Sequence, residues 1–404
     1  MIRYQGFVFE LKPNNVEKTL LRRFAGCSRF VWNEVLALNE LRFEYGEKIM
    51  NYHDAANYLK FLKSEHAWLN GVHSQPLQQT LMDLWKAYTN FFNPELAAEK
   101  PQFKKKFGRS GIRFPQGFKV ANKAIYLPKI GWIPYIQSRK ILGQPKSVTV
   151  SQRAEKWFVS ILTEREVEEP SHSGKSTVGI DLGVKIFAAL STGEKIFGPN
   201  SFEKLGRKLA HLNRELSRRV KFSKNWRKTK QKISCLHFRI ANTRKDALHK
   251  TSTAISKNHA IVFIEDLRIK NMTKSASGTI ENPGTNVAQK RGLNRRILDQ
   301  GWGMFGEQLA YKCYWNGGLL VRVNPRDTSR ECSECHFVAK ESRKTQSLFV
   351  CIACGFEKNA DINAANTIEY RGLRLLSGRD TSEVPVERSS NAVKQETRSN
   401  RKIA

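Results

Sequence analysis

Cys332-Ser-Glu-Cys335 and Cys351-Ile-Ala-Cys354 are two tight cysteine pairs with 15 residues between them. Two such knuckles place four thiolates tetrahedrally around one Zn²⁺ and leave no position open for water, so they predict a structural rather than a catalytic site. The competing interpretation is redox chemistry, but nothing in the flanking sequence resembles a redox fold. We therefore expect a zinc ribbon whose folding depends on each of the four thiolates, because metal binding and folding are one process in such modules.

Three carboxylates stand where apolar strands end or a helix begins. Asp181 lies in Val-Gly-Ile-Asp-Leu-Gly, Glu265 in Val-Phe-Ile-Glu-Asp, and Asp361 in Asn-Ala-Asp-Ile-Asn-Ala-Ala. A carboxylate among core residues is costly unless it is paired or binds a cation. Taken singly, each one could cap a helix or a turn. Together they predict one shared site for two Mg²⁺ ions about 3.5–4 Å apart, which would hold a phosphate and activate a water.

The composition is strongly basic. Among 404 residues, 69 are Lys or Arg and 37 are Asp or Glu, a formal net charge of +32 that a polyanion would neutralise. A chain of this length exceeds one hydrophobic core, so we expect two or more globular domains with nucleic acid as the partner. A basic protein of the membrane surface would need a long amphipathic helix with an unbroken apolar face, and the basic stretches here are interleaved with Asn, Thr and Ser.

Membrane insertion and secretion are not expected. No apolar run approaches the roughly 18 residues of a membrane span, and the first residues lack the apolar core of a signal peptide. An intracellular protein in a reducing compartment is therefore predicted, which also favours metal binding over disulfides for the paired cysteines. The other cysteines, Cys27, Cys235 and Cys313, have helical and partly apolar surroundings and are expected to be buried thiols.

The N-terminal half combines strands with helices. An aromatic and branched run that stops before Pro13 predicts a first strand. Helical periodicity then recurs in three stretches: 16–38, 52–69 and 77–92. A hairpin is predicted from two later strands: 147–152 and 157–164. If the first strand pairs with this hairpin, residues 1–12 and 124–168 form a small β-barrel into which a helical block, residues 13–123, is inserted.

A polar, turn-rich stretch at residues 165–177 marks the main domain boundary. Beyond it, five short strands are predicted, the first three as a meander: 177–181, 186–190, 195–197, 260–264 and 319–323. A Gly/Ser/Asn-rich lid or connector is predicted at residues 271–294, before a helix through Trp302 and Trp315.

Residues 204–258, between the third and fourth of these strands, are helical in character and dense in positive charge. Nine Lys and Arg residues fall between positions 214 and 232, among them Arg218, Arg219 and Lys228. A charge run is often only a solvated face. One as one-sided as this, in an already basic protein, favours contact with a phosphate backbone.

Two nucleotide-binding interpretations fail on the sequence. Gly174-Lys-Ser176 resembles the end of a phosphate-binding loop, but the glycine required five positions earlier is Glu169. Gly179-Ile-Asp-Leu-Gly183 resembles the first phosphate motif of the actin-like and chaperone ATPases. Those proteins need a second glycine-rich loop led by aspartate, and Gly317-Gly318 lacks that pattern.

The order of these features resembles TnpB, the accessory protein of bacterial insertion sequences and ancestor of the type V CRISPR effector nucleases. That order is an Asp-bearing strand, basic helices, a Glu-bearing strand, a four-cysteine ribbon and an Asp-bearing helix. The likeness is most specific from Asn324-Pro-Arg-Asp-Thr-Ser-Arg-Glu-Cys-Ser-Glu-Cys335 to Asp361-Ile-Asn-Ala-Ala-Asn366. The N-terminal half matches more loosely, through shorter stretches: Arg29-Phe-Val-Trp-Asn33, Leu77-Gln-Gln79, Phe91-Phe92 and Leu127-Pro-Lys-Ile-Gly131.

This resemblance implies a specific architecture. An α/β RNase H-like (RuvC) nuclease domain would occupy residues 169–372, with the zinc ribbon, residues 325–357, inserted before its last acidic residue. The N-terminal barrel would be a wedge domain interrupted by a helical recognition domain, which agrees with the division above. Residues 373–404 are polar and aperiodic and are expected to form a disordered tail.

The resemblance also implies an activity. A guide RNA made from the transposon end would direct cleavage of double-stranded DNA beside a short transposon-adjacent motif, in the bacterial or archaeal cytoplasm at the nucleoid. By motif match, Asp181, Glu265 and Asp361 become an Mg²⁺-binding catalytic triad. Because Asp361 follows Cys354 by only a few residues, we also expect the ribbon to help place Asp361 and to guide the nucleic acid strand to it. Base pairing supplies sequence choice in this scheme, so the protein needs mainly charge and shape.

Further residues are candidates for contacting nucleic acid. Glutamine can bind a base edge through two hydrogen bonds, so Gln78 and Gln116 are candidates for the adjacent motif. Arg326 is a further candidate for contacting nucleic acid. Related proteins that lack the acidic residues act as RNA-guided repressors. All three carboxylates are present here, which favours a nuclease over a repressor or transposition regulator. A direct transposase is disfavoured because no tyrosine-and-HUH arrangement for strand transfer is evident.

Overall fold

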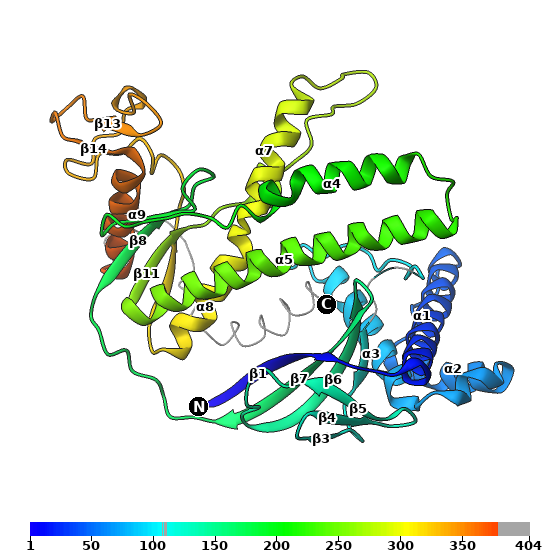
Figure 1. Cartoon of the computed structure of the whole chain (residues 1–404). Helices are drawn as coiled ribbons and strands as arrows, with labels where there is room; N and C mark the ends of the chain where they lie inside the picture. The colour runs from blue at the N-terminus through cyan, green and yellow to red at the C-terminus, as the bar shows by residue number, and fades with distance from the viewer. Residues whose placement is uncertain (107, 109–110, 379–404) are drawn as a thin grey trace. The chain divides into compact units, whose positions relative to one another are not determined.

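The computed structural model describes residues 1–106, 108 and 111–378. Two compact units divide the chain, Met1–Val167 and a second that begins at Glu168 (Figure 1). The division falls within the polar stretch that the sequence marks as a boundary. Within the described ranges, each helix is too short or too polar to cross a lipid bilayer.

The first unit contains a curled seven-stranded sheet in the order β2-β6-β7-β1-β5-β4-β3 (Figure 1). Its strands are β1 (Ile2–Leu11), β2 (Gly111–Phe114), β3 (Lys119–Ala121), β4 (Ala124–Leu127), β5 (Gly131–Ile136), β6 (Gln144–Arg153) and β7 (Lys156–Glu166). The predicted hairpin is confirmed as β6 and β7, and β1 pairs antiparallel with β7, with Phe9 opposite Val159. Because β2 and β3 lie at the two edges, closure into a barrel stays a prediction.

Three helices fill most of the chain between β1 and β2: α1 (Asn15–Glu44), α2 (Tyr52–Glu65) and α3 (Ser74–Phe92). A capping box starts α1, where Asn14 Oδ1 accepts from the Glu17 N–H at 2.9 Å and a Glu17 carboxylate oxygen accepts from the Asn14 N–H at 2.8 Å. The helical block expected over 13–123 is wrong in its second part, because β2 and β3 belong to the sheet. Strands of three or four residues are too short to show their period in the sequence.

The second unit is built on a five-stranded sheet in the order β10-β9-β8-β11-β12. Its strands are β8 (Thr177–Asp181), β9 (Ala188–Leu190), β10 (Lys195–Ile196), β11 (Ile261–Glu265) and β12 (Leu319–Val323). Strands β8, β11 and β12 are parallel, whereas β9 and β10 fold back antiparallel beside β8. The predicted meander and the two later strands are confirmed to within two residues.

In the part of the second unit that the structure describes, residues 168–378, six α-helices complete it: α4 (Ser201–Ser217), α5 (Lys224–Asn258), α6 (Ile269–Met272), α7 (Val287–Gln300), α8 (Trp302–Trp315) and α9 (Ala360–Leu376). Helix α7 corrects the connector expected over 271–294, since the Gln, Lys and Arg residues of its first turns give little apolar periodicity. Helix α9 includes residues 373–376, which were expected in the tail, and residues 379–404 lie outside the described part. Cys27 and Cys313 are buried as predicted, but Cys235 is exposed.

Helices cover both faces of the second sheet. Val262 and Ile264 of β11 pack in one apolar cluster with Phe305 of α8, whereas Phe263 packs in another with Ile368 of α9. This alternation follows from the two-residue period of a strand, which sends successive side chains to opposite faces. The unit is thus a three-layer α/β structure, and it holds all three predicted carboxylates.

Candidate active site

Asp181 and Glu265 end two neighbouring parallel strands, β8 and β11. The register pairs Ile180 with Ile264, so the two carboxylates follow at the same edge of the sheet. Glu265 is 9% exposed. This is the carboxyl edge, where open α/β sheets bind their ligands.

Asp361 approaches from the first turn of α9. The side-chain oxygen of Asn359 caps this helix by accepting from the Ile362 N–H at 3.4 Å. The helix lies close to β8 because Gly179 has no side chain, and a Cβ at that position would overlap the carbonyl oxygen of Ala365. The first glycine of the Gly-Ile-Asp-Leu-Gly motif therefore serves helix packing, which agrees with the rejection of a nucleotide-binding loop.

The charges of the other two carboxylates act on Asp181. Burial raises the pKa of Asp181 most, and the charges of Glu265 and Asp361 raise it further, to about 7, against the opposing charge of Arg343. The influence of Glu265 and Asp361 on Asp181 agrees with the predicted convergence of these residues, whose roles stay a prediction. The pKa of Asp181 stays raised despite the arginine, because burial and the two carboxylate charges outweigh it.

Glu265 is held in place by its own set of contacts. Burial raises the pKa of its carboxyl group, while a hydrogen bond from the Thr328 hydroxyl and the charge of Arg371 lower it. Thr328 lies in the segment after β12 and is itself buried. Its hydroxyl fixes one oxygen of Glu265.

Arg343 reaches the carboxylates from the cysteine module. Its Nη2 lies 3.6 Å from Asp361 Oδ1. The sequence did not single this residue out, because its only signal was a basic pair between the two cysteine pairs. Only the three-dimensional structure shows that this cation faces the acidic cluster.

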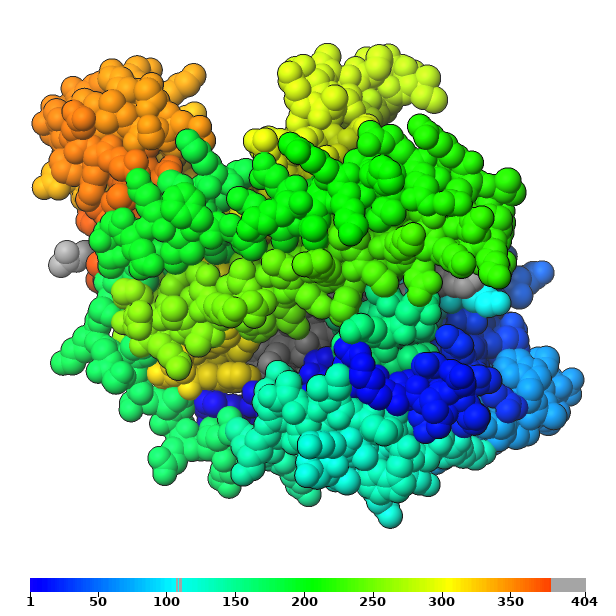
Figure 2. All heavy atoms as spheres, viewed as in Figure 1, coloured from blue at the N-terminus to red at the C-terminus, as the bar shows by residue number. Residues whose placement is uncertain are grey.

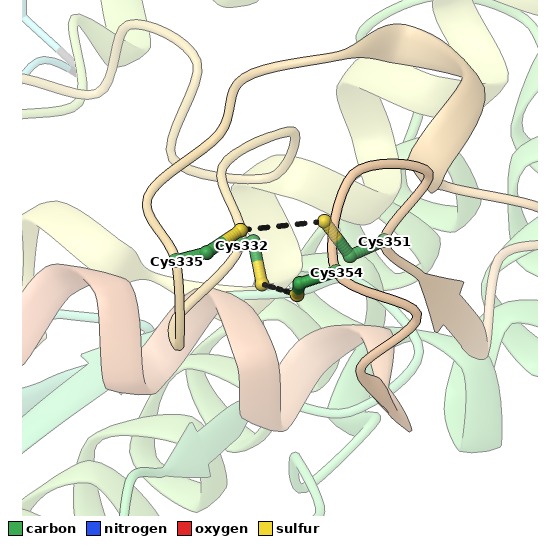
Figure 3. A group of neighbouring side chains, drawn as sticks. All are labelled: Cys332, Cys335, Cys351 and Cys354. Carbon is green, nitrogen blue, oxygen red and sulfur yellow. Dashed lines mark hydrogen bonds between the residues drawn. The ribbon is translucent and has the colours of Figure 1, made fainter.

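The four cysteine sulfurs meet between two knuckles (Figure 3). The Sγ atoms of Cys332 and Cys354 are 3.8 Å apart and those of Cys335 and Cys351 are 3.5 Å apart, and all four lie within 4.8 Å of one another. Tetrahedral Zn²⁺ with Zn–S bonds of about 2.3 Å requires sulfurs about 3.8 Å apart, whereas a disulfide requires about 2.05 Å. The cluster therefore fits a zinc ion, with four thiols rather than disulfides.

The two knuckles contain the same type of backbone turn. His336 and Gly355, which follow the second cysteine of each pair, have φ angles of 62° and 75°. Their N–H groups donate to the carbonyl oxygens of Cys332 and Cys351, each at 3.0 Å. After the second knuckle, β14 (Glu357–Asn359) pairs antiparallel with β13 (Leu348–Val350) and runs directly into α9.

Buried hydrogen bonds fix the cysteine module to α9. Asn363 Nδ2 donates to the carbonyl oxygen of Glu331 at 2.8 Å, and Asn363 Oδ1 accepts from the Ser333 N–H at 3.0 Å. Arg371 Nε donates to the Glu331 carboxylate at 2.7 Å. Asn363 is fully buried, so these contacts cannot be exchanged for water. No local sequence pattern indicates this network, which ties the module to the helix that carries Asp361.

Comparison with known proteins identifies the family. Three family models match: "Probable transposase" (OrfB_IS605) over residues 160–276, "Cas12f1-like, TNB domain" over 302–368 and "Helix-turn-helix domain" (HTH_OrfB_IS605) over 1–48. "Putative RNA-guided DNA endonuclease InsQ" of Escherichia coli (strain K12) is 48% identical over 398 residues, which cover 96% of this chain and 98% of that protein. The chain belongs to the TnpB family.

Other relatives of this TnpB-family protein include "Putative RNA-guided DNA endonuclease" of Streptomyces pristinaespiralis, 32% identical over 91% of this chain and 89% of that protein. "CRISPR-associated endodeoxyribonuclease Cas12f1" of Sulfoacidibacillus thermotolerans is 28% identical over 57% of this chain and 54% of that protein. Among solved structures, "Cryo-EM structure of the Cas12f1-sgRNA-target DNA complex" has a TM-score of 0.32 and 18% identity, over 91% of this chain and 98% of that one. The match to the TNB domain spans the cysteine cluster, Arg343 and Asp361.

The predicted nucleic-acid contacts of this TnpB-family protein are spread over both units. Five of them are exposed: Gln78 on α3, Gln116 between β2 and β3, Arg218 after α4, Lys228 on α5 and Arg326 after β12. Arg219 differs, because it is partly buried and its guanidinium pairs with the carboxylate of Glu215. Exposure leaves the five available to a ligand, and their roles stay predictions.

Proposed function

We propose that this TnpB-family protein is an RNA-guided, Mg²⁺-dependent DNA endonuclease in which Asp181, Glu265 and Asp361 are the catalytic carboxylates. The observation that carries the proposal is the placement of Asp181 and Glu265 at the carboxyl edge of one sheet, with Asp361 of α9 near enough for its charge, like that of Glu265, to act on Asp181. The strand order, an antiparallel meander followed by two parallel strands beside the first, supports the RNase H-like (RuvC) fold implied by the resemblance. The names of the relatives supply the RNA guide and the DNA target.

The acidic cluster suits a hard divalent cation. Its donors are carboxylate oxygens, the ligands that Mg²⁺ prefers, and a bound cation would offset the burial and the neighbouring carboxylate charges that raise the pKa of Asp181. Among the described residues, the four cysteines form the one group of three or more His, Cys, Asp or Glu ligand atoms that lie close enough together to hold a single metal ion, so the three carboxylates are spread more widely than the ligands of one ion. Two bound Mg²⁺ ions would activate a water and stabilise the leaving oxygen of the cleaved phosphodiester.

The protein's own groups orient this chemistry. Strands β8 and β11 hold Asp181 and Glu265 side by side, and the Thr328 hydroxyl fixes one oxygen of Glu265. Helix α9 presents Asp361 and in turn is held by the cysteine module. We assign the zinc ion a structural role, because four thiolates fill its coordination sphere.

The remaining assignments extend the same proposal. The first unit would act as the wedge-like and helical recognition domains, with Gln78 and Gln116 contacting the transposon-adjacent motif. The guide would be an RNA from the transposon end. Arg218, Lys228 and Arg326 would contact phosphates, which agrees with a net charge of +32.

A plasmid-cleavage assay tests the proposal. Protein isolated with its copurifying RNA is expected to cut a plasmid that carries the guide-matched sequence when Mg²⁺ is present. Asp181→Ala should bind the plasmid but not cut it. Asp246→Ala is the matched control, because Asp246 is an exposed carboxylate on α5 that pairs with Lys250 at 2.7 Å, and it should cut as the wild type does.

The alternatives give different outcomes. Target binding without cleavage by the wild type would indicate an RNA-guided repressor or transposition regulator. Sequencing of the copurifying RNA tests the RNA partner independently of cleavage. A transcript of the transposon end is expected. Absence of any discrete RNA would contradict the proposed guide.

A further inference from the structure

An exposed aromatic pair lies at the turn between α4 and α5. Phe222 is 61% exposed and its ring centroid is 5.4 Å from that of Trp226, with the planes at 60°. Val220 beside them is 78% exposed. The two helices lie side by side and this turn closes the end of their hairpin (Figure 1), and Figure 2 shows the helices as adjacent ridges on the viewed face.

The turn has a defined conformation. Phe222 has a φ of 68°, a left-handed conformation that is costly for an aromatic residue. Ser223 fixes the turn, because its N–H donates to the Val220 carbonyl oxygen at 3.1 Å and its hydroxyl caps α5 by accepting from the Trp226 N–H at 3.1 Å. The backbone thus holds a large apolar ring outward at a conformational cost, which a merely solvated turn would not require.

Positive charge surrounds this aromatic pair. Between positions 214 and 232 the chain has nine Lys and Arg residues and one acidic residue, Glu215. The ammonium groups of Lys221 and Lys230 lie 5.4 Å and 4.8 Å from the ring centroids of Phe222 and Trp226. An uncharged protein surface would not complement this patch, whereas a polyanion with exposed flat apolar faces would.

A cavity of about 360 Å³ adjoins the turn, lined by His211, Arg214, Glu215, Arg218 and Arg219. The Glu215 carboxylate pairs with Arg219 and also accepts from the Thr229 hydroxyl at 3.1 Å, which ties the end of α4 to α5 one turn after Trp226. Arg214 and Arg218 line the same cavity and are exposed. Arginine can hold a phosphate through two parallel hydrogen bonds, so the cavity suits an anion beside the rings.

We propose that the α4–α5 turn is a nucleobase-stacking site, in which Phe222 and Trp226 receive unpaired bases of the guide RNA and the adjoining arginine cavity receives their phosphates. This rests on the proposed RNA-guided function. RNA is favoured over the target strand of the DNA because the bases of that strand are paired within the guide–target duplex, which proteins hold by its backbone. Structured RNA offers splayed, unpaired bases, and proteins recognise them by stacking on aromatic side chains.

Equilibrium binding of two probes tests this proposal. The probes are an in vitro transcript of the copurifying RNA and a single-stranded DNA of the same sequence. Phe222→Ala combined with Trp226→Ala is expected to weaken binding of the transcript about tenfold or more, because losing the stacking of a single base already lowers affinity by about that factor. The slope of affinity against salt should not change, since no phosphate contact is lost. Trp226→Phe retains an aromatic ring and should bind nearly as the wild type does.

Two further variants separate stacking from charge. Val220→Ala removes an exposed apolar group beside the rings and should leave affinity unchanged. Arg214→Ala combined with Arg218→Ala should reduce the salt slope by about one for each lost phosphate contact. All of these residues except Trp226 are exposed, so far-UV circular dichroism should show an unchanged fold.

The outcomes are distinct. Unchanged transcript affinity in the Phe222 and Trp226 double variant overturns the stacking site, while RNA-guided cleavage by the wild type would leave the proposed function intact. Weaker binding of the DNA probe alone, or loss of a wild-type dimer in light scattering, would assign the turn to DNA or to self-association and overturn the RNA assignment. If the wild type binds no RNA, both proposals fail together.

Discussion

Gly179 of β8 lies against the carbonyl oxygen of Ala365 in α9, so close that any side chain at position 179 would overlap the helix backbone. Strand β8 ends at Asp181, and α9 carries Asp361 in its first turn. The absence of one methyl group therefore sets how near the helix carboxylate comes to the strand carboxylate. Packing in the core and the geometry of the acidic site are coupled at this contact.

Gly179→Ala is expected to lower the free energy of unfolding by about 1–3 kcal/mol, because the added methyl group forces α9 away from the sheet. Plasmid cleavage should fall as well, since Asp361 moves with the helix. Urea denaturation measures the first effect. The control is Gly206→Ala in α4, where the added group would meet only Phe202 at 3.9 Å, and stability there should stay equal or rise by up to about 1 kcal/mol. Equal stability of the two variants would show that α9 does not need this close approach.

The purified protein is expected to contain one zinc ion per chain, measured by atomic emission. Cys332→Ser and Cys351→Ser should each abolish it, because both sulfurs are buried in the four-thiol cluster and metal binding is what folds such a module. The Asn363 and Arg371 contacts to Glu331 would then be lost, so cleavage should fall with the zinc content. Cys235→Ser, outside the cluster, should retain the ion. Zinc content near zero in the wild type would contradict the site.

Features of the structure are predictable from the sequence where a pattern has a short-range physical cause. The spacing of four cysteines predicts their cluster directly, since knuckle geometry is local. Apolar runs with sharp polar ends gave β8 and β12 at their observed bounds, Thr177–Asp181 and Leu319–Val323. Predicting that the three carboxylates meet requires two further steps. Parallel strands share one carboxyl edge, and α9 must return to that edge.

Other features depend on contacts between distant parts of the chain, which no local pattern encodes. Arg343 faces Asp361 only because the cysteine module folds back onto α9. Asn363 is a polar residue in a helix, an arrangement usually found on a surface, yet it is buried because it bonds to both Glu331 and Ser333. Strand β3 has three residues, and its partner β4 rather than its own sequence determines it.

Asp181→Asn is expected to stabilise the protein in buffer without Mg²⁺. Burial and the neighbouring carboxylates raise the pKa of Asp181 from 3.8 to about 7, so the folded protein binds a proton that the unfolded chain releases. The stability that this proton contributes is present in full below pH 3.8 and is lost as the pH rises through about 7. The advantage of asparagine, which has no charge to bury, should therefore grow over this interval and then level off, at no more than about 4 kcal/mol.

Thermal midpoints between about pH 5 and pH 8 measure this difference. Asp246→Asn, which changes an exposed carboxylate on α5, controls for the loss of one negative charge. A difference between Asp181→Asn and the wild type that does not vary with pH would contradict the assigned cause. If Asp181→Asn stabilises the protein and also abolishes cleavage, the acidic site is maintained for function at a cost in stability.

Arg343 and Mg²⁺ are expected to compete for the same carboxylates, because the arginine already lies 3.6 Å from Asp361 and lowers the pKa of Asp181. Arg343→Gln should reduce the Mg²⁺ concentration needed for half-maximal thermal stabilisation by about fivefold, since a partly exposed ion pair contributes about 1 kcal/mol. The variant should also melt at a lower temperature than the wild type before Mg²⁺ is added. Arg343→Lys keeps the charge, so its thermal stability should depend on the Mg²⁺ concentration nearly as that of the wild type does. A higher Mg²⁺ requirement in Arg343→Gln would instead mean that the arginine supports the metal-bound arrangement, as it would if it oriented Asp361 toward the ions.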